Sequence, residues 1–217
     1  MPASPDSLSF APELPLKFVG GDPSVDFVNT VDWTVAGLKN DRLVDYQRVI
    51  EWANRGRVLD RSTLRRLRET AGDRPRAARS AYAQARWARW VLQRVFASVA
   101  TGKASVAALD DFNRLLRDAA QYVRLVWRGP VAVEWQAGRT DDLNAILWTV
   151  TRAAARLLET EAPQLRICAG PDCGWMYVDR SRNRLRRWCQ MQTCGTVAKS
   201  RRRAARVAAS NVNRAKA

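Results

Sequence analysis

Two pairs of cysteines, crowded into one short stretch, constrain the fold more than any other feature of this sequence. Cys168 and Cys173 form one C-x4-C pair, Cys189 and Cys194 form a second, and fifteen residues separate the pairs. The rest of the 217-residue chain contains no cysteine, and the whole chain contains no histidine. Two close pairs at about this separation are typical of a structural zinc site. Because four thiolates complete the tetrahedral coordination of Zn2+, we expect one structural zinc ion without an open position for catalysis.

The residues around the cysteines favour a zinc finger over four unrelated buried thiols. Gly170 and Pro171 allow a tight turn between the first two ligands. Residues 175–178 are predicted to form a strand and 185–188 a returning strand, and Cys194 begins a helical pattern. This order predicts a treble-clef-like finger, whose small core would need about 10 kcal/mol or more from the metal. An iron–sulfur cluster is the remaining alternative, although its typical short spacings are absent.

Positive charge is concentrated in the same region. The formal net charge of the chain is +16, and residues 164–217 carry 13 basic and only 2 acidic side chains. Such a local excess is typical of proteins that bind a polyanion. On a helix after Cys194, four basic residues would form one stripe, and the hairpin would add five arginines. The predicted nucleic-acid contacts are Arg180, Arg182, Arg184, Arg186, Arg187, Lys199, Arg202, Arg203 and Arg206.

We expect DNA as the partner, because the planar guanidinium of arginine can bind a phosphate or a guanine edge through two hydrogen bonds. RNA binding is one alternative, and a solvated basic face is another. A zinc-stabilised module for protein interaction or scaffolding is the alternative from a different class. An enzyme is not expected, because the lack of histidine excludes Ser-His-Asp and Cys-His catalysis and no other catalytic motif is recognisable.

The cellular location follows from two absences in the sequence. No apolar run of about 18 residues predicts a membrane span, and residues 1–6 do not have the basic start and apolar core of a signal peptide. We therefore expect a cytoplasmic, nucleoid-associated protein with no membrane partner. In a reducing compartment, clustered cysteines bind metal more often than they form disulfides.

The part of the chain before the finger is predicted to be a mainly helical domain with one β-hairpin, which makes the fold class α+β. Apolar residues at helical spacing, together with capping residues, predict five helices, over 45–56, 60–71, 75–102, 106–120 and 141–162. Leu109 and Val99 are expected on inward faces of two of them. Residues 122–127 and 131–135 predict the hairpin, and 25–31 are interpreted as an extended segment.

These elements suggest four parts. We expect a flexible N-terminus over 1–15, the helical domain over 16–162, the zinc finger over 163–208 and a basic tail over 209–217.

Three polar residues of the helical domain could serve either structure or function. Asp26, Asn29 and Thr30 lie among apolar residues. One interpretation is that they cap and tie a turn. The other is that they line a ligand pocket in a sensor domain, with tryptophans as its walls.

Several motifs resemble a known arrangement of two families. Residues 168–175, 179–183 and 187–199, with all four cysteines, resemble the CGNR zinc finger of bacterial regulators. Residues 20–22, 26–30 and 52–53 resemble the ABATE domain that commonly precedes this finger. The resemblance covers nearly the whole chain. It implies zinc on the four cysteines, a stress-related transcriptional regulator whose finger binds DNA, and an N-terminal domain that binds a small-molecule effector. A homodimer is considered as well.

The chain departs from the family at the motif that gives the finger its name. Cys-Gly-Asn-Arg is replaced here by Cys194-Gly195-Thr196-Val197. The metal ligand and the glycine remain, so metal binding should be unaffected. If the family's Asn and Arg contact DNA, this chain has lost that pair at the start of its helix.

Overall fold

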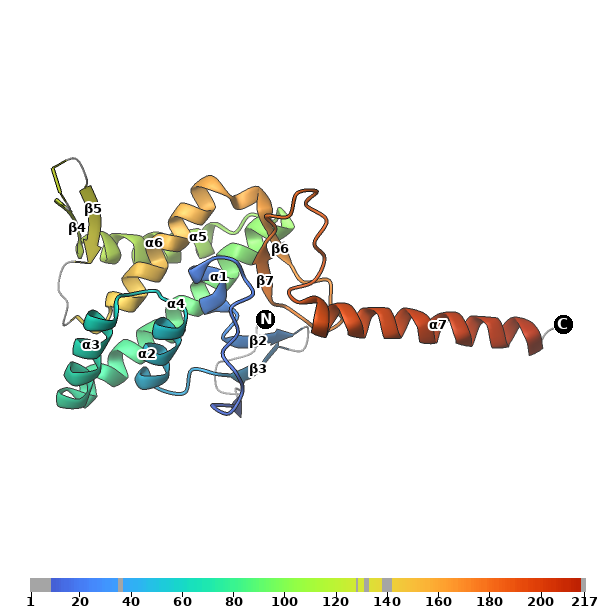
Figure 1. Cartoon of the computed structure of the whole chain (residues 1–217). Helices are drawn as coiled ribbons and strands as arrows, with labels where there is room; N and C mark the ends of the chain where they lie inside the picture. Colours follow the sequence, from blue (N-terminus) through green and yellow to red (C-terminus); the bar gives the residue numbers. More distant parts are fainter. Residues whose placement is uncertain (1–8, 35–36, 128, 131–132, 138–141, 216–217) are drawn as a thin grey trace.

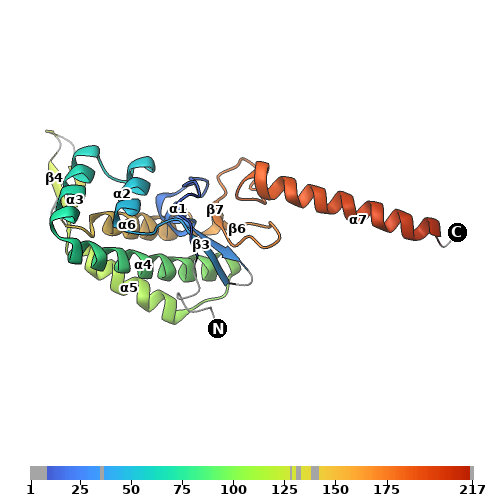
Figure 2. The same cartoon turned by 90° about the horizontal axis from the view of Figure 1, so that it is seen from below.

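The fold consists of a helical body and one helix that extends away from it (Figure 1). The computed structural model describes residues 9–34, 37–127, 129–130, 133–137 and 142–215. Figure 2 shows the same extended helix from below, with its far end distant from the body. The finger lies where this helix meets the body.

The body begins with a short helix where we expected an extended segment. Residues 23–28 form α1 (Pro23–Val28), and β2 (Val31–Thr34) follows it. The side chain of Asp22 accepts a hydrogen bond from the Ser24 amide, and Pro23 occupies the first helical position. Asp before Pro is a helix-start pattern that outweighed the β-branched residues of this segment.

The next four helices confirm the predictions based on apolar spacing and capping. They are α2 (Tyr46–Arg55), α3 (Arg61–Asp73), α4 (Pro75–Thr101) and α5 (Val106–Ala120). Asp45 and Asp60 cap the first two through their side chains. Gly102 ends α4 with φ 67°, a left-handed conformation that glycine adopts at little cost.

The long helix α4 is the centre of the body. It contacts α1, α2, α3, α5, α6 and β6. Ala81, Ala85, Ala88 and Leu92 on its inner face are buried as expected. The inward positions predicted for Leu109 and Val99 are wrong, because these side chains are 49% and 36% exposed. On α5, Ala108 and Leu115 are buried on the inner face instead.

The last helix of the body, α6 (Ala145–Thr160), has a different start from the predicted one. Its N-terminal flanking residue is Asn144, which makes no side-chain cap. Asp142 instead accepts hydrogen bonds from the Asn144 amide at 2.9 Å and the Trp148 indole at 3.1 Å. Asp141 lies outside the described residues.

Two small sheets belong to the body. The first has the order β1-β3-β2, with β1 (Ser9–Phe10) parallel to β3 (Gly37–Asp41) and β2 antiparallel to it. This pairing and the burial of Ala11 hold a segment that we expected to be mobile. The second sheet is the predicted hairpin, β4 (Val123–Trp127) with β5 (Val133–Ala137), and residues 128, 131 and 132 of that prediction lie outside the described residues.

The finger has a different strand pairing from the predicted one. After a 3-10 turn (Ala162–Gln164), β6 (Leu165–Ile167) pairs antiparallel with β7 (Met176–Val178). The expected return strand over 185–188 has no strand partner in the described chain. β6 occupies one edge of β7, and Asn29 and the Gly20 carbonyl bond the backbone on its other edge. A π-helical turn (Met191–Gly195) then leads directly into α7 (Thr196–Ala215), the extended helix.

Candidate metal centre and nucleic-acid interface

The four cysteine sulfurs converge on one point. Cys168 follows β6, Cys173 precedes β7, and Cys194 lies in the π-helical turn before α7. All four Sγ atoms lie within 4.8 Å of one another, with Cys173–Cys189 at 3.9 Å and Cys189–Cys194 at 3.6 Å. Sulfurs bound at about 2.3 Å around a tetrahedral Zn2+ lie about 3.8 Å apart. The donor set and its spacing therefore fit one zinc ion, and these four residues would hold it.

Backbone groups support the cluster from outside. The amides of Gly170 and Cys189 donate to the Cys168 sulfur at 3.3 and 3.2 Å. Hydrogen bonds from the Cys173 and Cys189 thiols lower the pKa of Cys168, and the same hydrogen bonds raise the pKa values of Cys173 and Cys189. A bound zinc ion would keep all four as thiolates. A Cβ at Gly170 would lie 3.0 Å from the Cys194 sulfur, so the turn needs a residue without a side chain.

The finger has a small apolar core of its own. Trp175, Tyr177, Cys168 and Cys189 are buried together, and Trp188 packs against them while half-buried. The aromatic residues of the finger therefore serve as its core. Strands β6 and β7 also pack against the body, because their residues Leu165, Met176 and Val178 are buried in its main core.

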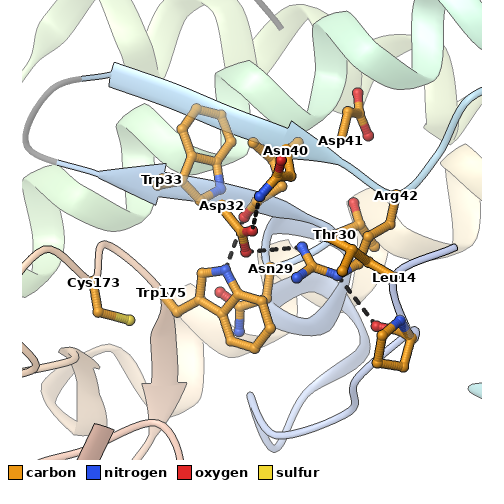
Figure 3. Close-up of polar contacts among 12 residues, drawn as sticks. Leu14, Asn29, Thr30, Asp32, Trp33, Asn40, Asp41, Arg42, Cys173 and Trp175 are labelled. Carbon is orange, nitrogen blue, oxygen red and sulfur yellow. Dashed lines mark hydrogen bonds and ion pairs between the residues drawn. The ribbon is translucent and has the colours of Figure 1, made fainter. Parts of the chain in front are cut away.

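A joint of hydrogen bonds fixes the finger to the body. Asn29 bonds the backbone of Met176 in both directions, donating to its carbonyl at 2.8 Å and accepting from its amide at 3.0 Å. The Trp175 indole donates to the Val31 carbonyl at 2.8 Å, and the Gly174 amide donates to Trp33 O at 2.7 Å. Asn29 and Trp175 lie close together beside the sheet in Figure 3. Nothing in the sequence indicated these pairings, since about 145 residues separate the partners.

The loop before α1 forms the second half of the joint. The Val178 amide donates to the Gly20 carbonyl at 2.7 Å, and the Arg186 guanidinium donates to the Val19 carbonyl at 2.8 Å. Arg180 donates to the Gly21 carbonyl. The finger is therefore attached to the body at both ends of α1.

The three polar residues that we considered as ligand contacts have three different surroundings. Asn29 is in the joint. Thr30 donates to the Phe27 carbonyl at 2.7 Å and accepts from Arg89 at 2.8 Å, deep in the body. Asp26 accepts from the Gly20 amide at 2.7 Å and also lines a cavity. The structure does not bring the three together around one space, and a ligand-binding role stays a prediction.

A cavity of about 340 Å3 lies between the first sheet and the metal centre. Arg42 forms one side, where its guanidinium lies 5.1 Å from the Trp175 ring centroid and pairs with Asp32 at 2.9 Å (Figure 3). Cys173 also faces this region, and Cys189 and Cys194 line it. The metal centre is therefore accessible from this side.

The predicted nucleic-acid contacts fall into two groups by their surroundings. Arg186 is half-buried, donates to the carbonyls of Val19, Trp188 and Cys189, and lies 4.2 Å from the Tyr177 ring centroid. Arg180 is exposed but is paired with Glu161 at 2.7 Å. The second group is exposed as well, and it consists of Arg182, Arg184, Arg187, Lys199, Arg202, Arg203 and Arg206.

Asp179 shapes the loop that presents the exposed arginines of the finger. It is fully buried and accepts hydrogen bonds from the amides of Ser181 and Arg186 at 3.0 and 3.1 Å and from the Ser181 hydroxyl at 2.6 Å. These hydrogen bonds, above all that from the Ser181 hydroxyl, lower the pKa of Asp179. An Asp two residues before a Ser is a turn pattern that could have indicated this role. Arg182 and Arg184 are carried on this loop.

The start of α7 is exposed where the family motif is replaced. Thr196 is exposed and donates to the Met191 carbonyl at 3.2 Å, and Val197 is 47% exposed. Val197 therefore does not pack against the metal centre. The side chain at this position is thus directed to solvent, where a basic residue would be available to a partner.

Within the described residues, none of the helices combines the length and the apolar character that a membrane span requires.

Comparison with known proteins gives a family match for the body and another for the finger. The family model for ABATE, described as "Putative stress-induced transcription regulator", matches residues 21–161, and the model for the CGNR zinc finger matches residues 164–207. A search of curated proteins finds no match. The second match contains all four cysteines, so family and geometry both identify zinc as the metal that these residues would hold. Since the first match alone covers more than half of the sequence, this chain belongs to the ABATE family, and its C-terminal part is a CGNR zinc finger.

Proposed function

We propose that this chain is a transcriptional regulator that binds DNA through its zinc finger and α7, and that an effector bound by the body controls it. The observation that carries the proposal is α7 itself, which extends from the metal centre into solvent in both views (Figures 1 and 2). A helix of 20 residues is about 30 Å long, enough to lie across or along a groove of DNA.

The composition of α7 supports a polyanion as its partner. The helix contains Lys199, Arg202 and Arg203, all exposed, and its sequence contains no acidic residue. An isolated helix of this length is only marginally stable, and its positive charges repel one another. Phosphates would relieve this repulsion, so DNA binding and helix stability should increase together.

The exposed arginines of the finger complete the proposed surface. We assign DNA contact to Arg182, Arg184 and Arg187 and a positioning role to Arg186 and Arg180, whose guanidinium groups are already hydrogen-bonded to the protein. Arg206 belongs to the contact surface by its place on α7. A small rigid metal centre at the base of both elements holds the loop and the helix in a fixed relation.

Binding of the zinc-loaded chain to genomic DNA fragments across a salt series tests the proposal. The logarithm of the binding constant should fall with the logarithm of salt with a slope of about −0.9 per phosphate contact. The double variant Arg202→Ala/Arg203→Ala should weaken binding and reduce the slope by about 2. Arg65→Ala/Arg68→Ala, in exposed positions of α3, removes the same charge and should leave the slope nearly unchanged.

The outcome of this experiment also separates the alternatives. Negligible binding at low salt would contradict the proposal and leave a protein-interaction module. A preference for RNA fragments over DNA of equal length would replace DNA as the partner. Equal effects of the two double variants would show that net charge alone drives binding.

The replaced motif gives a second test of the same surface. Restoring Asn and Arg in the double variant Thr196→Asn/Val197→Arg places two polar side chains at exposed positions at the start of α7. We expect about a tenfold gain in affinity, within the range of one good base or phosphate contact. An unchanged affinity would mean that this end of α7 does not approach DNA.

A further inference from the structure

A second cavity lies in the body, away from the metal centre. It has a volume of about 330 Å3, which is within the range of small-molecule sites. The end of α2, the start of α1 and the loop before α1 surround it. Its lining residues include Phe18, Asp22, Asp26, Trp52, Arg55 and Arg57.

Aromatic rings form one wall of this cavity. Phe18 and Trp52 are stacked with ring centroids 6.4 Å apart and planes inclined by 22°. Trp52 is fully buried, whereas Phe18 is 38% exposed and forms the outer part of the wall. Such a wall favours a ligand with a flat apolar part.

A buried carboxyl group without a counter-ion faces the same space. Asp26 is 8% exposed, and its hydrogen bond to the Gly20 amide is a contact with a neutral group. No ion pair with Asp26 occurs in the part of the chain that the structure describes. Burial raises the pKa of Asp26 to about 7, because desolvation of the carboxylate outweighs the hydrogen bond from Gly20 and the charge of Arg186, which both lower it.

The cations near the cavity do not neutralise this carboxyl group. Arg55 pairs with Glu51 at 2.6 Å, and Arg186 on the finger side is hydrogen-bonded to backbone carbonyls. Arg57 is exposed at the rim, on a turn with φ 52°. A second carboxylate, Asp22, also lines the cavity and caps α1. The interior of the site thus offers carboxyl groups and aromatic rings.

We infer that this cavity binds a small organic cation, of the class of arylalkyl amines, whose ammonium group pairs with Asp26 and whose ring packs on Phe18, which in turn stacks on Trp52. Aromatic faces attract a desolvated cation, and a buried carboxylate gains most from a charged partner that arrives without its water. The inference rests on the proposed effector control and gives it a site and a ligand class.

The site also has a direct route to the finger. Asp26 accepts a hydrogen bond from the Gly20 amide, and the Gly20 carbonyl accepts one from the Val178 amide of β7. A Cβ at Gly20 would lie 3.0 Å from the Asp26 carboxylate, so the loop has no spare room. A ligand that fixes Asp26 therefore fixes Gly20 and, through the same loop, the carbonyls that hold Arg180 and Arg186.

Calorimetric titration of the zinc-loaded full chain, without DNA, tests the site with three probes of similar shape. Benzylamine should bind, benzyl alcohol should bind at least about tenfold more weakly, and benzoate should bind more weakly still. Asp26→Asn keeps the shape and an acceptor for the Gly20 amide, and should weaken benzylamine binding by about tenfold or more. Asp118→Asn, at an exposed position of α5, should change nothing.

A second variant and a second readout keep the test decisive. Phe18→Leu removes the outer aromatic ring of the cavity wall. It should weaken benzylamine binding about threefold or more without unfolding the chain. Saturating benzylamine should slow hydrogen exchange at the Val178 amide in the wild type and not in Asp26→Asn. Benzoate binding as tightly as benzylamine, or binding unaffected by Asp26→Asn, would overturn the inference. Because no DNA is present, these results are independent of whether the chain binds DNA.

Discussion

The body and the finger are stabilised in different ways. The body buries a continuous apolar core that includes Trp52, Phe96, Leu92 and Ile146. The finger buries two aromatic residues and two cysteines. Burial at about 25 cal/mol per Å2 can stabilise the first without help, whereas the second is too small for that. The difference teaches that the finger depends on two supports from outside its own core, the metal and the joint with the body.

Removing the metal should separate the two regions most strongly. Cys189→Ser, or chelation of zinc, should unfold the loops over 168–174 and 179–195, because zinc binding contributes on the order of 10 kcal/mol to folding. The body should stay folded, and so should β6 and β7, whose Leu165, Met176 and Val178 lie in its core. Hydrogen exchange measured along the chain, with elemental analysis for one zinc per chain, checks both expectations.

A matched control makes this prediction specific. Ser200→Cys adds a thiol at an exposed position of α7 and should leave the finger and its zinc content unchanged. If the loops of the finger stayed protected after chelation, the metal would not be what folds them. If the body unfolded with the finger, the two cores would be one cooperative unit.

The sequence predicted the body and the metal ligands for clear physical reasons. Helices depend on local spacing and capping, which Asp45, Asp60 and Gly102 display over a few residues. The cysteines are a local pattern as well. The joint is different, because Asn29 and Met176 meet across 147 residues and neither has a local pattern that predicts the other. The strand pairing of the finger was missed for a related reason, since the edges of β7 are taken by β6, which lies before the cysteines, and by the distant residues Asn29 and Gly20.

Weakening the joint should have the next largest effect. Asn29→Ala removes both hydrogen bonds to the Met176 backbone and leaves a buried amide and a buried carbonyl without partners. We expect the free energy of unfolding to fall by about 3 kcal/mol. Chemical denaturation measures the loss, and hydrogen exchange should show faster opening of β7 at unchanged zinc content.

Asn113→Ala is the control for the joint, because this asparagine is exposed on α5. It should change stability by less than about 0.5 kcal/mol. Equal, small losses for the two variants would mean that the metal alone holds the finger in place.

The smallest effects on stability are expected from single arginine substitutions within the finger, and they should differ between half-buried and exposed arginines. Arg186→Ala removes hydrogen bonds to the carbonyls of Val19, Trp188 and Cys189, and should lower the free energy of unfolding by about 2 kcal/mol. Arg182→Ala removes an exposed side chain and should lower the free energy of unfolding by less than about 0.5 kcal/mol.

DNA binding should distinguish the same two variants in the opposite order. Arg182→Ala should reduce the slope of the salt dependence by about 1 while the fold stays unchanged. Arg186→Ala should instead weaken DNA binding only because it destabilises the finger. Saturating zinc should therefore partly restore the DNA affinity of this variant. A stable Arg186→Ala chain that had lost one unit of salt slope would move Arg186 from the joint to the DNA-binding surface.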